Sequence, residues 1–104
     1  MAKYHRNNKK NKDTHHLYEI LDLLEDDVLK YGISGDPIDQ DGLSKRLREQ
    51  VDLFNIVANW YRFEGHIIVK DIPGNEAARK LETAFIEAYE AIHGRKPRGN
   101  RRKQ

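Results

Sequence analysis

Apolar residues are regularly spaced from about residue 14 to residue 93, and the first block of this pattern, residues 15–33, fits two kinds of element. Thr14 would cap a helix over this block at its N-terminus, and Gly32 would end it. The spacing typical of an amphipathic helix is followed by Leu17, Ile20, Leu21, Leu24 and Val28. Taken alone, this spacing predicts a helix.

The same block also fits a β-hairpin with strands over residues 16–23 and 28–34. The polar tripeptide Glu25-Asp26-Asp27 separates two apolar runs, as a turn does. The flanking runs contain aromatic and β-branched residues of the kind that favour strands, among them Tyr18, Ile20 and Ile33. Periodicity does not decide between the helix and the hairpin.

Residues 35–42 form a loop, because Pro37 and two glycines interrupt regular structure there. A helix then begins at about residues 42–44, with Asp41 or Ser44 as the N-cap, and ends before Trp60. Arg46 and Gln50 lie beside its buried face. The inward stripe of this helix consists of Leu43, Leu47, Val51, Phe54 and Ala58.

A β-branched run predicts a strand over residues 66–72, and its nearly continuous apolar character suits a central position in a sheet. A second helix follows over residues 76–93, with Asn75 as N-cap and Gly94 as its end. Its inward stripe is Ala77, Leu81, Phe85, Ala88 and Ile92. With the first block as a hairpin or as a helix, these elements make a small α+β domain.

Composition narrows the classes of protein. A chain of 104 residues holds one domain, and the absence of cysteine excludes disulfides, thiolate metal sites and thiol catalysis. No apolar run approaches the roughly 18 residues of a membrane span, and the first residues lack the apolar core of a signal peptide. We therefore expect a soluble domain without a membrane partner.

The net charge of +2 conceals an uneven distribution. Residues 1–12 carry five bases and residues 95–104 carry six, with no acid in either segment, so residues 13–94 hold eight bases against all 17 acids. Such basic arms would engage a polyanion with strong salt dependence, or would simply be solvated ends. We expect a disordered basic leader over residues 1–13, a folded domain over residues 14–100 and a basic tail over residues 101–104.

Five short motifs follow one another along the chain. They are His16-Leu17-Tyr18, Lys30-Tyr31-Gly32-Ile33-Ser34, Ser44-Lys45-Arg46-Leu47 continuing to Gln50-Val51, Leu81-Glu82, and Pro97-Arg98-Gly99-Asn100. In this order they resemble the GIY-YIG nuclease family, and more narrowly the GIY-YIG domains found as C-terminal toxin modules of bacterial polymorphic toxins. The resemblance spans residues 15–100 and implies a three-stranded antiparallel sheet flanked by helices, hence a hairpin over residues 15–33.

The resemblance implies that the domain is a divalent-metal-dependent endonuclease that uses Mg²⁺ or Mn²⁺. DNA is favoured over RNA as its substrate. Tyr18 matches the tyrosine of the first motif, Lys30 or Tyr31 the polar residue that opens the second, Arg46 the arginine of the first helix, and Glu82 the metal-binding glutamate. Asn100 matches the late asparagine and would hydrogen-bond the backbone near the site. Candidate nucleic-acid contacts are Lys45, Arg48, Arg98, Arg101 and Arg102.

A toxin domain of this kind implies a cognate immunity protein as a partner. It also implies action in the cytoplasm, or delivery as an effector into the cytoplasm of a target cell. The sequence departs from the family pattern in three places. His16 stands where the first motif has glycine, the gap from Gly32 to Arg46 is longer than in many members, and Gln50 stands where several family nucleases have histidine.

Each candidate has a task in phosphodiester cleavage and a plainer alternative. Glu82 would hold a metal that keeps most of its waters, or it is an exposed helix glutamate. Arg46 would clamp the phosphate with its planar donor fork, or it belongs to a surface basic cluster. Tyr18 and Tyr31 would position or deprotonate the water, or they are half-buried strand tyrosines. The alternative functions are a non-catalytic nucleic-acid-binding module and a domain whose acidic body meets a basic partner protein.

Overall fold

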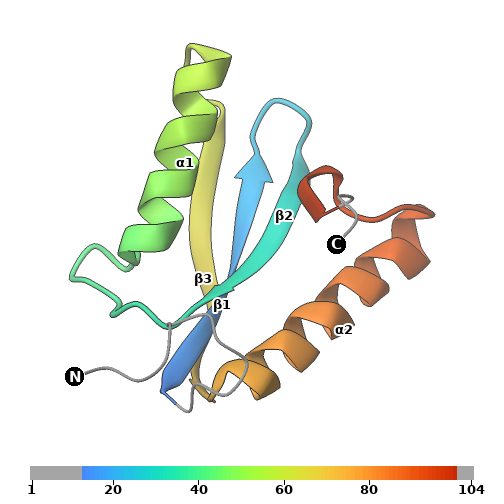
Figure 1. Cartoon of the computed structure of the whole chain (residues 1–104). Coiled ribbons are helices and arrows are strands. Elements are labelled where there is room, and N and C mark those ends of the chain that lie inside the picture. The colour runs from blue at the N-terminus through green and yellow to red at the C-terminus, as the bar shows by residue number, and fades with distance from the viewer. Residues whose placement is uncertain (1–12, 101–104) are drawn as a thin grey trace.

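The computed structural model describes residues 13–100, which form a three-stranded antiparallel sheet flanked by two helices (Figure 1). The predicted α+β class is therefore confirmed. The predicted leader, apart from Asp13, and the tail over residues 101–104 lie outside the described residues. In chain order the elements are β1 (Thr14–Asp22), β2 (Asp27–Ser34), α1 (Lys45–Ala58), β3 (Phe63–Pro73), α2 (Asn75–His93) and the short 3-10 helix η1 (Arg98–Asn100).

The ambiguous block over residues 15–33 is a hairpin, so the helical interpretation is wrong. β1 pairs with β2 on one side and with β3 on the other, and these pairings satisfy its backbone along nearly its whole length. The turn between β1 and β2 is held by Asp22, whose carboxylate accepts the N–H groups of Leu24 and Glu25 at 3.1 and 3.3 Å. Leu24, which a helix would have placed on its apolar stripe, is 58% exposed.

The strand predicted over residues 66–72 is present within β3, but the strand order is β2-β1-β3, so β1 is the central strand and the predicted central position of residues 66–72 is wrong. The sequence of β1 does not indicate a central strand, because three of its buried residues are polar: His15, His16 and Asp22. Each of these has a hydrogen-bond partner that makes burial tolerable. β3 extends from Phe63 to Pro73 and lies at an edge, where one side of its backbone is free of the sheet.

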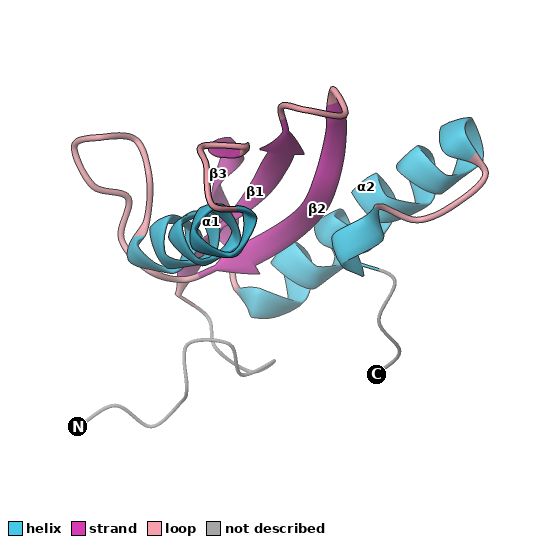
Figure 2. Cartoon of the chain, turned by 90° about the horizontal axis from the view of Figure 1, so that it is seen from above, coloured by secondary structure: helices cyan, strands magenta, loops and turns pink. Residues whose placement is uncertain are grey.

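The two helices cover opposite faces of the sheet (Figure 2). Alternation along β1 produces this division, since Tyr18 and Ile20 face α1 while Leu17 faces α2. On the α1 side they pack with Leu47, Val51 and Phe63, and the partly buried Phe54 and Ala58 confirm the predicted stripe along α1. Leu43 packs against the same cluster but precedes the helix, which begins at Lys45. On the α2 side, Leu17 packs with Ile33, Ile72 and Ala78.

The second helix differs from prediction at both ends. Gly74 is its N-cap, and the predicted cap Asn75 is instead its first helical residue, fully buried. Ala77, Leu81 and Phe85 pack on the sheet as expected, but the predicted inward positions of Ala88 and Ile92 are wrong. Both residues are exposed, Ile92 to 80%, because the last turns extend beyond the sheet core. Neither helix that the structure describes is long and apolar enough to cross a membrane.

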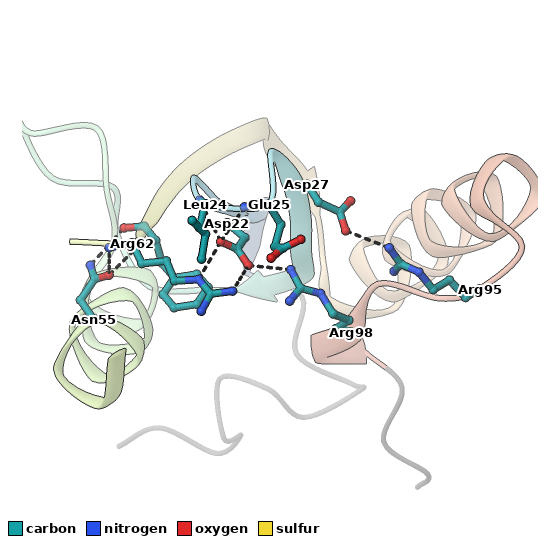
Figure 3. A network of polar contacts seen from close by, with 9 residues as sticks. Asp22, Leu24, Glu25, Asp27, Asn55, Arg62, Arg95 and Arg98 are labelled. Carbon is teal, nitrogen blue, oxygen red and sulfur yellow. Dashed lines mark hydrogen bonds and ion pairs between the residues drawn. The ribbon is translucent and has the colours of Figure 1, made fainter. Parts of the chain in front are cut away.

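A network of ion pairs closes the C-terminal segment over the hairpin (Figure 3). The fully buried Asp22 carboxylate accepts two hydrogen bonds from Arg62, each 2.8 Å long, and one of 2.7 Å from Arg98. Arg95 pairs with Asp27 at 3.0 Å. Arg62 first, then Arg98 and the backbone N–H of Glu25, hold the pKa of Asp22 well below its usual range. Residues 95–100 are therefore an integral part of the fold.

Candidate active site

The centre of the candidate site is Tyr18, whose side chain lies on the α1 face of β1 and is 1% exposed. Its ring crosses Gly32, the residue that pairs with it in β2. A Cβ at position 32 would lie 2.4 Å from both Cζ and the hydroxyl oxygen of Tyr18, so only glycine leaves room for the ring. The Tyr18 hydroxyl donates to Oε1 of Gln50 at 3.0 Å. Strand β2 and helix α1 thus fix this phenol from two sides.

Arg46, in the first turn of α1, lies near enough to Tyr18 for its charge to act on the phenol. Burial raises the pKa of Tyr18, while the positive charge of Arg46 acts in the opposite direction. The Arg46 side chain itself is exposed. An exposed guanidinium beside a buried phenol leaves donors available to an incoming anion.

Glu82 approaches the group from α2. Burial raises the pKa of its carboxyl, and the positive charges of Arg79, Lys30 and Arg46 oppose that rise. The negative charge of Glu82 in turn contributes to the raised pKa of Tyr18. Tyr18, Arg46 and Glu82 are therefore close enough to influence one another, although they come from a strand and two different helices.

The structure distinguishes the two candidates from the second motif. In the regular part of the β1–β2 pairing, Lys30 stands opposite Ile20, on the face that carries Tyr18. Tyr31 stands opposite Glu19 and packs edge to face on Phe85 of α2, with ring centroids 5.5 Å apart. Burial first, then Glu19 and Asp27, raise the pKa of Tyr31. The structure brings Lys30 to the site and leaves Tyr31 on the other face of the sheet.

The side chain of Asn100 hydrogen-bonds the backbone of Tyr31 rather than a side chain of the site. Its Oδ1 accepts the N–H of Tyr31 at 2.8 Å, and its Nδ2 donates to the carbonyl of Tyr31 at 3.0 Å. It therefore occupies the outer edge of β2 as a neighbouring strand would. Next to it, a Cβ at Gly99 would lie 2.8 Å from the Cβ of Lys30. The end of the chain thus braces the strand that carries Lys30.

The predicted nucleic-acid contacts are placed less uniformly. Lys45 is exposed next to Arg46. Arg48 pairs with Asp39 and Asp41 at 3.1 and 2.9 Å, and Arg98 pairs with buried Asp22, so carboxylates already engage both guanidinium groups. Arg101 and Arg102 lie outside the described residues.

Two further residues belong to the site's surroundings. Gln50, noted only as a departure from the family pattern, accepts the Tyr18 hydrogen bond. His16, also noted only as a departure, is 2% exposed and its Nε2 lies 2.9 Å from the Ser44 hydroxyl. Since alternate strand residues share a face, the spacing of two between His16 and Tyr18 was a signal that could have placed His16 here.

Among residues 13–100 no group of three or more histidine, aspartate or glutamate side chains could hold a metal ion. Glu82 supplies one partly buried carboxylate. Mg²⁺ commonly takes one or two protein carboxylates and completes its shell with waters and substrate phosphate. The chemistry of this donor set therefore fits Mg²⁺ or Mn²⁺ held jointly with a substrate.

Comparison with models of protein families matches residues 8–94 to the family described as URI fold toxin 2. The matched segment includes Tyr18, Arg46 and Glu82 and ends before the Pro97–Asn100 motif. Neither the curated proteins nor the solved structures contain a match.

Proposed function

We propose that this chain, which belongs to the URI fold toxin 2 family, is a delivered toxin effector that hydrolyses phosphodiester bonds in nucleic acid, DNA in preference to RNA, with Mg²⁺ or Mn²⁺. The URI fold is related to the folds of GIY-YIG-like nucleases. The observation that supports the proposal is that the charges of Arg46 and Glu82 act on the buried Tyr18 phenol, while Lys30 lies on the same face of the sheet as Tyr18.

The groups of this site match the needs of the reaction. Hydrolysis adds water to phosphorus, breaks one P–O bond and protonates the departing oxygen, so the site must hold the phosphate and place a water. The exposed guanidinium of Arg46 can bind two phosphate oxygens at once. A metal held by Glu82 would supply a Lewis acid and an activated water.

We assign Tyr18 the task of orienting a water, with its phenol not ionised in the free protein. The raised pKa of its hydroxyl keeps the phenol protonated near neutral pH. The positive charge of Arg46 acts on this phenol, and the phenol proton is directed at Gln50. A water that hydrogen-bonds the phenol oxygen would be held at a fixed angle to the phosphate that Arg46 binds.

Lys30 and Asn100 support this arrangement. Lys30 places a positive charge near Glu82, which favours the ionised carboxylate that a metal requires. Asn100 holds the β2 edge beside Lys30. The alternative of a binding module that uses the C-terminal arm gains less support, because Arg95 and Arg98 are paired with Asp27 and Asp22.

The test is nicking of supercoiled plasmid by the purified chain with Mg²⁺, with Mn²⁺ and with a chelator. We expect metal-dependent nicking that Glu82→Ala abolishes. Glu87→Ala is the matched control, since this exposed carboxylate lies on the same helix and nicking should survive its loss. Equal activity of wild type and Glu82→Ala would refute the assignment of the metal-binding residue.

A cognate immunity protein is also part of the proposal, because toxin domains that act inside cells require protection of the producing cell. We expect the immunity protein to inhibit nicking when it is present at one molecule per molecule of toxin. An immunity protein that binds the chain but leaves nicking intact at saturation would count against a partner that blocks this site.

A further inference from the structure

His16 stands on the strand face that carries the site, two residues before Tyr18, and its ring centroid lies 6.2 Å from that of Tyr18. The ring is almost completely buried, at 2% exposure, and therefore cannot contact a nucleic acid directly. A buried polar ring needs a specific partner, and the Nε2 of His16 has one in the Ser44 hydroxyl at 2.9 Å.

Ser44 is the N-cap of α1, yet its side chain makes no capping hydrogen bond. Serine at this position ordinarily accepts an N–H from the first turn. Here Asp36 from the preceding loop does so, accepting the N–H of Arg46 at 3.2 Å. The Ser44 hydroxyl is thereby left to hold His16, and the first turn of α1 is tied both to the loop and to the central strand.

We propose that His16 is a positioning residue of this site, which acts through Ser44 to hold the first turn of α1 and so keeps Arg46 near Tyr18. This inference rests on the proposed function for its catalytic consequence. Arg46 lies two residues after Ser44 in the first turn of α1, so a shift of the cap would carry the Arg46 backbone with it. The sequence thus uses histidine at a family glycine position as a tie between β1 and α1.

The state of the ring agrees with this role. Burial lowers the pKa of His16, and the charge of His15 lowers it further, while Asp36 opposes the shift. A ring that stays neutral adds no positive charge next to the N-terminus of α1, where a cation is unfavourable. Neutral imidazole can still donate or accept at Nε2, depending on its tautomer, so the hydrogen bond to Ser44 persists.

The experiment compares His16→Ala, Ser44→Ala and the double variant in single-turnover cleavage with protein in excess, alongside binding of DNA without metal. Misplacement by about 1 Å can cost about 10²-fold in rate, and we expect each single variant to lose at least ~10-fold at saturation. Binding should change by less than about two-fold, because His16 does not touch DNA. The double variant should be no slower than the slower single variant, as expected for two residues that act as one tie.

Two further variants separate positioning from general stability. His16→Gln retains an amide that can reach Ser44, and it should recover most of the rate. Asn55→Ala removes three hydrogen bonds at the far end of α1, to Arg62 and Phe63, and should lower the melting temperature without changing the rate. An unchanged rate in Ser44→Ala and His16→Ala, with Arg46→Ala inactive, would overturn the inference while leaving the proposed function standing.

A readout independent of cleavage keeps the two claims distinct. The Nε–H resonance of Arg46 in ¹⁵N-labelled protein should shift in Ser44→Ala and His16→Ala and stay near its wild-type position in His16→Gln and Asn55→Ala. If wild-type protein cleaves nothing, the proposed function fails and this resonance alone decides the inference. An Arg46 resonance that does not move in Ser44→Ala would overturn it.

Discussion

Gly32→Ala is the sharpest local perturbation that the structure offers. The added methyl would lie 2.4 Å from two atoms of the Tyr18 side chain. Ordinary contact needs about 3.5–4.0 Å, so the ring must move by roughly 1 Å or the strands must separate. Overpacking of this kind costs about 1–3 kcal/mol of unfolding free energy. The displaced hydroxyl would leave Gln50 and Arg46, and a misplacement of about 1 Å lowers the cleavage rate by about 10²-fold.

The assay combines urea denaturation with single-turnover cleavage at saturating protein. Gly42→Ala is a matched control, because Gly42 has φ +82° with nothing within 4 Å of an added Cβ. Alanine there costs about 1–2 kcal/mol through backbone strain alone and does not touch the site. We expect similar losses of stability but a slower rate only in Gly32→Ala. Unchanged cleavage in a folded Gly32→Ala variant would refute the role given to the Tyr18 hydroxyl.

Two other substitutions test the electrostatics of the fold. Asp22→Ala should lower the unfolding free energy by about 3–5 kcal/mol in urea, since it strips a buried carboxylate from Arg62 and Arg98. Because the pKa of Asp22 is lowered in the folded state, the carboxylate contributes to the unfolding free energy above its unfolded pKa of about 4, and this contribution is lost as the pH falls. An Asp22→Ala variant whose stability falls with acid as steeply as that of the wild type would contradict this. Glu82→Gln should raise the melting temperature at pH 7 while abolishing cleavage, because the raised pKa of Glu82 means that its ionised form is disfavoured in the fold. This gain should shrink as pH falls toward that raised pKa, and a lower melting temperature at pH 7 would argue against a buried carboxylate.

The parts of the fold that could be predicted from sequence are those governed by local pattern. The α1 stripe from Leu47 to Ala58 was predicted correctly, because one helix face meets one sheet face. The hairpin could not be chosen from periodicity, since Leu17 to Val28 satisfies both helical and strand spacing. Pairing with β3, which lies some fifty residues later in the chain, decides it, and such long-range contacts leave no local trace.

The central position of β1 was missed for a related reason. His15, His16 and Asp22 make the strand look half-exposed, and their partners are distant in sequence. Arg62 and Arg98, which neutralise Asp22, lie 40 and 76 residues away. A sequence pattern therefore places such polar residues at the surface, because the residues that hydrogen-bond them are known only from the tertiary structure.

The candidate site residues Tyr18, Arg46 and Glu82 were named from the resemblance, and in the structure the charges of Arg46 and Glu82 act on Tyr18. The choice between Lys30 and Tyr31 depended on the pairing of the two strands, in which Gly32 stands opposite Tyr18 and Lys30 therefore shares the face of Tyr18. His16 and Gln50, which were not among the predicted site residues, make hydrogen bonds around this group.

The most direct test of the account compares Arg46→Ala with Lys80→Ala in Mg²⁺-dependent cleavage of DNA at saturating protein. Each variant removes one exposed positive charge, but only Arg46 acts on the Tyr18 hydroxyl and on Glu82. We predict loss of cleavage in Arg46→Ala, with a preserved melting temperature, and a rate close to wild type in Lys80→Ala. Equal rates in the two variants would contradict the claim that Tyr18, Arg46 and Glu82 form the active site.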